Sequence, residues 1–348
     1  MVKLASQFVA LSTQRRALAF AQTAARMSAS SVMVEKDFWV CWLLGLLFAD
    51  TKLAPHLVFK GGTSLSKVYG VIDRFSEDID VSMSPAFVGA DESVFEGIKS
   101  RTRRDASLAQ MQAQCGAKTR EVLMPRLERA IVEHLGARKQ GAPWLRFEDD
   151  PVARSPVVHF AYPTAAEPGF EYLRREVKLE LGSLTDQRPA EQHLVRAWVI
   201  DDFPAVFADW NCQVTALELP RTFWEKATIL HAEHHRPPDQ AMPDRYARHY
   251  SDMVRLLQHQ SAPAMLADHA TCARVVKWKS LVFARQWARY DLAKPGSFRL
   301  VPNDARVAAL ARDYAQMRAM FIAPPADFSA VLAQLADAEH TLNGLGVL

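Results

Sequence analysis

The chain has 348 residues, of which 49% are hydrophobic and 23% are charged, and its net charge is only +3. This composition excludes an intrinsically disordered chain and predicts a packed protein with room for about two domains. The four cysteines are scattered without a CxxC pair, which is typical of reduced, buried cysteines in a cytoplasmic protein and excludes a disulfide framework.

Residues 1–50 are expected to be helical. The segment Glu35–Val40 (EKDFWV) opens a strongly apolar helix, and Trp39, Trp42 and the leucines that follow form a stripe that is expected to pack against a sheet. The longest apolar run, Val40–Ala49, is far shorter than the ~20 residues that span a bilayer. No membrane association is therefore expected.

The stretch Val58–Ser82 carries the strongest chemical signal. A short apolar strand runs into the turn Gly61–Ser64, a helix-compatible segment follows, and a second strand carries Asp78 and Asp80. Residues two apart on a strand share a face, so these two carboxylates point the same way and repel each other unless a cation lies between them. Oxygen ligands of this kind suit Mg²⁺, and the backbone N–H groups of the turn are suited to cradling phosphates.

A later region of the chain is strongly basic. Ten basic residues against four acidic ones lie between Lys99 and Lys139, in segments expected to be helical. This is either an ordinary solvated helix surface or an electrostatic track for a polyanion such as RNA.

The alternating strand Arg175–Leu181 places Glu176, Lys178 and Glu180 on one face. We expect a third metal carboxylate from this strand, and the alternation alone leaves both Glu180 and Glu176 as candidates. A solvated sheet face with ordinary charge pairs remains the simpler explanation.

Beyond Ala216 the pattern becomes helical. Pro220 begins a helix that carries Lys226, and a later helix presents Arg248, His249 and Asp252 on one polar stripe. We therefore expect N-terminal helices with a mixed core over residues 1–215 and a helical domain over residues 216–348.

Four segments occur in an order and spacing that resemble a known family. Together they are similar to the AbiEii/AbiGii toxin family, which includes the MenT-like toxins, within the polymerase-β-type nucleotidyltransferase superfamily. The segments are Glu35–Val40, Lys60–Val81, Arg221–His231 and Arg248–Leu256. The resemblance implies an α+β fold with a polymerase-β-type nucleotidyltransferase core, in which helices flank a mixed sheet, and a helical C-terminal domain.

The same resemblance implies roles for individual residues. Asp78 and Asp80 correspond to the metal carboxylates of the first motif, and Lys178–Gly182 resembles the second motif, the loosest match, with Glu180 at its acidic position. Lys226 and Asp252 fall on the third-motif lysine and the fourth-motif aspartate. Two Mg²⁺ ions about 4 Å apart are implied at the carboxylates. The residues expected to bind the NTP are Gly62, Thr63, Ser64, Lys67 and Lys226; those expected to be catalytic are Asp78, Asp80, Lys226 and Asp252.

The implied activity is transfer of a nucleoside monophosphate from an NTP to RNA, most simply to the 3′ end of a tRNA. The family further implies a toxin of a toxin–antitoxin or phage-defence pair, with a cognate antitoxin protein as partner. Two alternatives stay open: nucleotidyl transfer to a small molecule or a protein, and a non-catalytic, nucleotide-binding interaction protein of the same fold. The intact Gly62, Ser64, Asp78, Asp80 and Lys226 argue against the second alternative.

Overall fold

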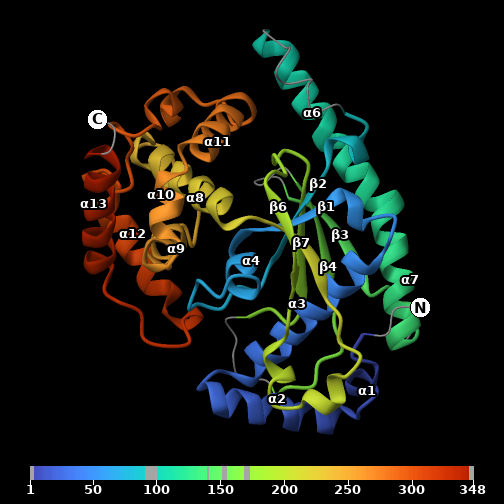
Figure 1. Ribbon diagram of the computed structural model, residues 1–348. Helices are drawn as coiled ribbons and strands as arrows, with labels where there is room; N and C mark the ends of the chain where they lie inside the picture. The colour runs from blue at the N-terminus through green and yellow to red at the C-terminus, as the bar shows by residue number, and fades with distance from the viewer. Residues whose placement is uncertain (1–3, 91–99, 139–140, 151–154, 168–172, 345–348) are drawn as a thin grey trace. The chain divides into compact units, whose positions relative to one another are not determined.

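The computed structural model describes residues 4–90, 100–138, 141–150, 155–167 and 173–344 (Figure 1). The chain divides into two compact units. The sheet unit comprises Met1–Val68 and Phe75–Leu217, and the helical unit comprises Tyr69–Arg74 and Glu218–Leu348. Lys99 and Lys139, which delimit the expected basic region, lie outside the described residues. No helix in the described ranges is long and apolar enough to cross a membrane.

A mixed sheet forms the core of the sheet unit. Its seven strands follow the order β3-β4-β5-β2-β1-β7-β6. The central strand β2 pairs antiparallel with β1 and parallel with β5, while β1 and β7 are also parallel. The strands are β1 Leu57–Lys60, β2 Ile79–Met83, β3 Leu145–Asp150, β4 Ser155–Phe160, β5 Val177–Gly182, β6 Ala190–Leu194 and β7 Gln213–Leu217.

Helices flank this sheet and make up most of the helical unit, which confirms the expected α+β class. In the sheet unit they are α1 Ser6–Val9, α2 Thr13–Met27, α3 Ser31–Ala49, α4 Gly61–Lys67, α6 Arg101–Lys118 and α7 Met124–Leu135. In the helical unit they are α8 Leu219–His234, α9 Arg248–Gln258, α10 Ala262–Ala267, α11 His269–Val282, α12 Asp304–Gln316 and α13 Phe328–Gly344.

One face of the sheet is apolar and covered by helices. The Sγ of Cys115 on α6 lies 3.7 Å from the Sδ of Met83 on β2. On the same face, Trp42 of α3 stacks on Phe160 of β4, with ring centroids 5.8 Å apart. Because side chains alternate along a strand, the polar residues of β2 and β5, Asp80 among them, point to the opposite face.

Helix α3 is as apolar as expected, but its burial is not limited to one stripe. Its side chains are buried without interruption from Val32 to Phe48, so no face is left for solvent. The expected packing against the sheet is present, but α2 and α7 also contact α3 and enclose it. Three charged residues at its start, Glu35, Lys36 and Asp37, are therefore buried as well.

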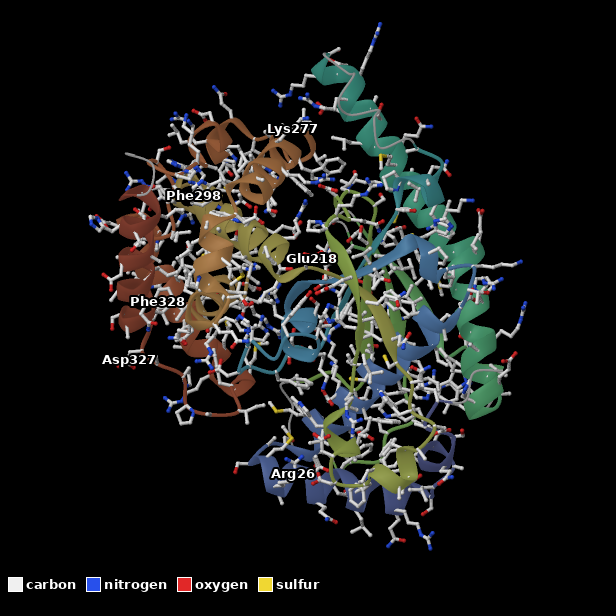
Figure 2. All side chains as sticks on the ribbon, viewed as in Figure 1. Arg26, Glu218, Lys277, Phe298, Asp327 and Phe328 are labelled. Atoms are coloured by element: carbon white, nitrogen blue, oxygen red, sulfur yellow. The ribbon has the colours of Figure 1, made fainter. Side chains whose placement is uncertain are left out.

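The helical unit has its own aromatic core. Phe298 and Phe328, labelled in Figure 2, are buried against Trp224 of α8 and Tyr250 of α9, with ring centroids 5.8 Å and 6.1 Å apart respectively. The unit also contains Tyr69–Arg74, a segment from between α4 and β2 that was expected to belong to the N-terminal core.

Candidate functional site

Three carboxylates gather on the polar face of the sheet unit. Strands β2 and β5 run parallel, with Asp80 directly opposite Glu180. Asp78 precedes β2 and shares a face with Asp80 because the two are separated by one residue. Glu176, the alternative third carboxylate, lies before β5, and its Oε1 accepts a hydrogen bond from His159 Nδ1 at 2.9 Å. The register therefore favours Glu180.

The electrostatics of this cluster show that the carboxylates repel one another. Burial, and then the negative charges of Glu77, Glu180 and Asp80, raise the pKa of Asp78 to about 6. The cation of Lys178 acts in the opposite direction. A divalent cation would relieve the same repulsion.

Lys178 already supplies one positive charge to the cluster. Its Nζ donates to Glu180 Oε1 at 2.5 Å and lies 3.9 Å from Asp150 Oδ2. Within the described residues, no group of three or more His, Cys, Asp or Glu side chains has the arrangement of a metal site. The donor type of Asp78 and Asp80 fits a hard cation such as Mg²⁺, while the carboxylate of Glu180 is held by Lys178 in this structure.

Gly61 is required for the position of Asp80. Its φ of +81° is a conformation that L-residues with a side chain rarely adopt, and a Cβ added there would lie 2.1 Å from Asp80 Oδ2. The glycine therefore leaves the space that the carboxylate occupies. Sequence reasoning treated Gly61 only as part of a phosphate-binding turn and missed this packing role.

In the expected phosphate cradle, the side chain of Thr63 is used in internal hydrogen bonds, whereas that of Ser64 is not. The buried Thr63 hydroxyl donates to the carbonyl oxygen of Asp78 at 2.5 Å and hydrogen-bonds the Ser76 hydroxyl at 2.9 Å. The side chain of Thr63 thus fixes the chain beside the carboxylates. Ser64 is also buried, but its Oγ has no hydrogen-bond partner in the described part of the chain. Gly62 and Ser64 lie in the first turn of α4, which has no side-chain cap, so they fit a phosphate group.

Lys67 is not brought to the carboxylates. Its Nζ is buried and forms an ion pair with Asp37 Oδ1 at 2.6 Å, and it lies 4.9 Å from the ring centroid of Trp198. Removing this cation from its partner would leave a buried charge on Asp37. We therefore leave Lys67 out of the nucleotide site that the sequence suggested for it.

The charged start of α3 holds the chain around the carboxylates. Lys36 Nζ donates to the carboxylate of Glu77, the residue before Asp78, and also to the carbonyl oxygen of Arg174 at 2.9 Å. Glu35 accepts from Arg175 Nη2 at 3.2 Å. Sequence reasoning missed these roles; the available signal was three consecutive charges at the head of an otherwise apolar helix.

A second cluster lies in the helical unit, where Lys226 of α8 meets Asp252 of α9. Lys226 Nζ donates to Asp252 Oδ2 at 2.7 Å. Arg74 holds the same carboxylate with two hydrogen bonds, Nε to Oδ1 at 2.8 Å and Nη2 to Oδ2 at 2.7 Å. The sequence placed Arg248 and His249 beside Asp252 on one stripe of the same helix and gave no sign of Arg74.

Both charges of this pair are perturbed by burial and by each other. Burial alone would raise the pKa of Asp252, but Arg74 and Lys226 hold it well below its usual range. Burial also lowers the pKa of Lys226, and Asp252 opposes that change. Asp252 is therefore a permanent carboxylate that orients two cations.

Comparison with known proteins identifies the family. A search of curated proteins gives no match. Among solved structures, the nucleotidyltransferase toxin MenT4 from Mycobacterium tuberculosis H37Rv is 17% identical, with 94% of this chain and 98% of that chain covered and a TM-score of 0.44. JHP933 from Helicobacter pylori is 15% identical, with 87% and 94% covered and a TM-score of 0.31. Residues 43–334, most of the chain, match the family described as nucleotidyl transferase AbiEii toxin, type IV toxin–antitoxin system. The chain therefore belongs to the AbiEii family of toxin nucleotidyltransferases.

Proposed function

We propose that this nucleotidyltransferase moves a nucleoside monophosphate from an NTP to RNA, with the 3′ end of a tRNA as acceptor and Mg²⁺ as cofactor. The observation that carries the proposal is the grouping of Asp78, Asp80 and Glu180 on one face of adjacent strands. Phosphoryl transfer of this kind depends on positioning and on stabilisation of charge, and it needs no covalent nucleophile.

Each group of the sheet unit then has a role in holding the reacting centre. Asp78 and Asp80, with Glu180 when it exchanges Lys178, would hold two Mg²⁺ ions. When bound, the metal activates the acceptor hydroxyl and stabilises charge on the phosphates. Gly61 leaves space for the carboxylate of Asp80, and Thr63 fixes the backbone at Asp78.

The triphosphate needs donors and positive charge. The first turn of α4 offers the N–H of Gly62 and the unpartnered hydroxyl of Ser64. Lys226 neutralises the triphosphate, and Asp252 fixes the direction of its ammonium group. The acceptor 3′-hydroxyl loses its proton to solvent and its oxygen bonds to the α-phosphorus, while the bond to the β-phosphate breaks and pyrophosphate leaves.

The reaction is tested with purified protein, each of the four α-³²P-labelled NTPs in turn, Mg²⁺ and total RNA. We expect label in the tRNA fraction for the wild type and for Glu176→Gln, and none for Asp80→Asn. Equal labelling by Asp80→Asn would refute the metal role. Label that appears in protein or in a small molecule would replace RNA as the acceptor.

We further propose that this activity is the toxic half of a toxin–antitoxin or phage-defence pair that acts in the cytoplasm, with a cognate antitoxin protein as partner. The family assignment supports this. Induced expression should arrest bacterial growth, and co-expression of the neighbouring reading frame should restore it. Arrest of equal strength by Asp80→Asn would show that toxicity does not come from nucleotidyl transfer.

A further inference from the structure

A pocket of about 180 Å³ opens on the surface of the sheet unit, where α2 and α1 meet the turn Pro204–Phe207. The side chains that line this α2 pocket are apolar, apart from Arg15 and Gln22. At its base lies Phe8, which is 1% exposed and packs against Phe207 with ring centroids 4.7 Å apart. Small-molecule sites usually have about 300–1,000 Å³, so the α2 pocket better fits a single apolar side chain of a partner.

Helix α2 contributes one stripe of side chains to the pocket. Arg15, Leu18, Ala19 and Gln22 follow one another at spacings of three, four and seven, so they lie on the same face of the helix. Leu18 is 64% exposed, more than any other large apolar side chain in the described ranges, whereas Ala19 is 8% exposed. An exposed leucine beside an apolar hollow is typical of an interaction surface.

Hydrogen bonds fix the walls of the pocket. The N–H of Ser6 on α1 donates to Asp209 Oδ2 at 3.0 Å, which ties α1 to the chain after the turn. Thr23 Oγ1 on α2 donates to Asp202 Oδ2 at 2.6 Å, and Arg26 Nε forms an ion pair with Asp202 Oδ1 at 2.7 Å. The α2 pocket is therefore formed before any partner binds, and the carboxylates of its walls are already engaged.

Arg15 gives the rim of the pocket a positive charge. Its backbone N–H is used in the cap of α2, but its guanidinium has no hydrogen bond or ion pair within the described part of the chain. Helices α1 and α2 contain no acidic residue that could neutralise it. The surface is thus complementary to an apolar side chain with a carboxylate nearby. A second copy of this chain would bring its own Arg15, and like charges would repel.

We propose that the α2 pocket docks an acidic segment of a protein partner, which places an apolar side chain against Leu18 and a carboxylate on Arg15. The apolar anchor excludes water from the pocket, and the ion pair at the rim selects acidic over basic segments. The inference does not rest on the proposed function, because it involves neither the NTP nor the metal.

A library of random peptides displayed on phage identifies what the pocket selects. The wild-type protein is the target, and an excess of Leu18→Asp protein in solution removes peptides that bind other surfaces. We expect the enriched peptides to share a large apolar residue with Asp or Glu close to it in sequence. No enrichment, or a consensus without an acidic residue, would overturn the inference.

Fluorescence polarisation with the most enriched peptide then tests each contact. Leu18→Ser and Arg15→Glu should each weaken binding at least about tenfold, because one loses buried apolar area and the other places like charges together. The matched controls are Leu194→Ser on β6, where the leucine is 54% exposed, and Arg129→Glu at an exposed position of α7. Both controls should bind as the wild type does, and circular dichroism melts check that every variant folds.

A charge exchange tests the ion pair directly. A peptide whose acidic residue is replaced by lysine should bind the wild type weakly and should recover affinity for Arg15→Glu. Equal binding of the original peptide to the wild type and to Arg15→Glu, or no recovery in the exchange, would refute the role of Arg15. Analytical ultracentrifugation tests the other occupant: a wild-type dimer that Leu18→Asp converts to a monomer would show that a second copy fills the pocket, and the acidic partner would be rejected.

Discussion

Replacing Gly61 with alanine should damage activity far more than stability. The backbone at Gly61 has a φ of +81°, so alanine carries the strain of a left-handed residue, about 1–2 kcal/mol. At about 2–4 °C per kcal/mol for a unit of this size, the melting temperature should fall by about 2–8 °C. The new Cβ would lie 2.1 Å from Asp80 Oδ2, whereas real Cβ contacts essentially never fall below 3.0 Å, so the carboxylate must retreat by at least 0.9 Å (3.0 − 2.1).

A displacement of about 1 Å at a reacting centre can cost about a hundredfold in rate, and we expect that loss for Gly61→Ala. The assay is transfer of α-³²P label from NTP to tRNA, measured together with a thermal melt. Gly89→Ala is the control, because Gly89 is in the same unit with a φ of +74° and no atom within 4 Å of an added Cβ. If both variants lose a few degrees and both retain the wild-type rate, the position of Asp80 is not what the glycine protects.

Three further substitutions test other parts of the site. Lys67→Met should destabilise the protein by about 3–5 kcal/mol in urea denaturation, because it leaves Asp37 buried without its cation, and the KM for NTP should not change. Thr63→Val should lower kcat about tenfold with little change in KM, since the hydroxyl holds the carbonyl of Asp78; a raised KM with an unchanged kcat would instead indicate a phosphate contact. His231 is buried with a lowered pKa, so the unfolded chain takes up its proton first and stability is lost as pH falls below about 6.5. The stability difference between pH 7.5 and 5.0 should shrink by up to about 2 kcal/mol in His231→Asn, and an unchanged difference would contradict this sign.

Local patterns in the sequence were enough to predict the central strands. The alternation around Asp80 and Glu180 predicted which face each side chain occupies, because successive side chains along a strand point to opposite faces of the sheet. The sequence could not supply the pairing of β2 with β5, since the two strands lie about a hundred residues apart and their register depends on the whole sheet. That register places Glu180, and not Glu176, directly opposite Asp80.

Buried ion pairs were the main features that the sequence did not predict. The sequence does not reveal the ion pairs of Lys67 and Lys36, because their partners Asp37 and Glu77 come from other elements. The same holds for Arg74, whose partner Asp252 is 178 positions away along the chain. For Lys36 and Asp37 the local indication was a charge on the otherwise apolar helix α3, and it does not identify the partner.

Tyr69–Arg74 belongs to the helical unit but is synthesised before most of the sheet unit. The ribosome produces this segment early, but Lys226 and Asp252 emerge only after the entire sheet unit has been made. Domains usually fold as they leave the ribosome, and here one unit cannot be completed until the chain is nearly finished. A nascent chain that ends before residue 252 therefore cannot form the Arg74–Asp252–Lys226 cluster.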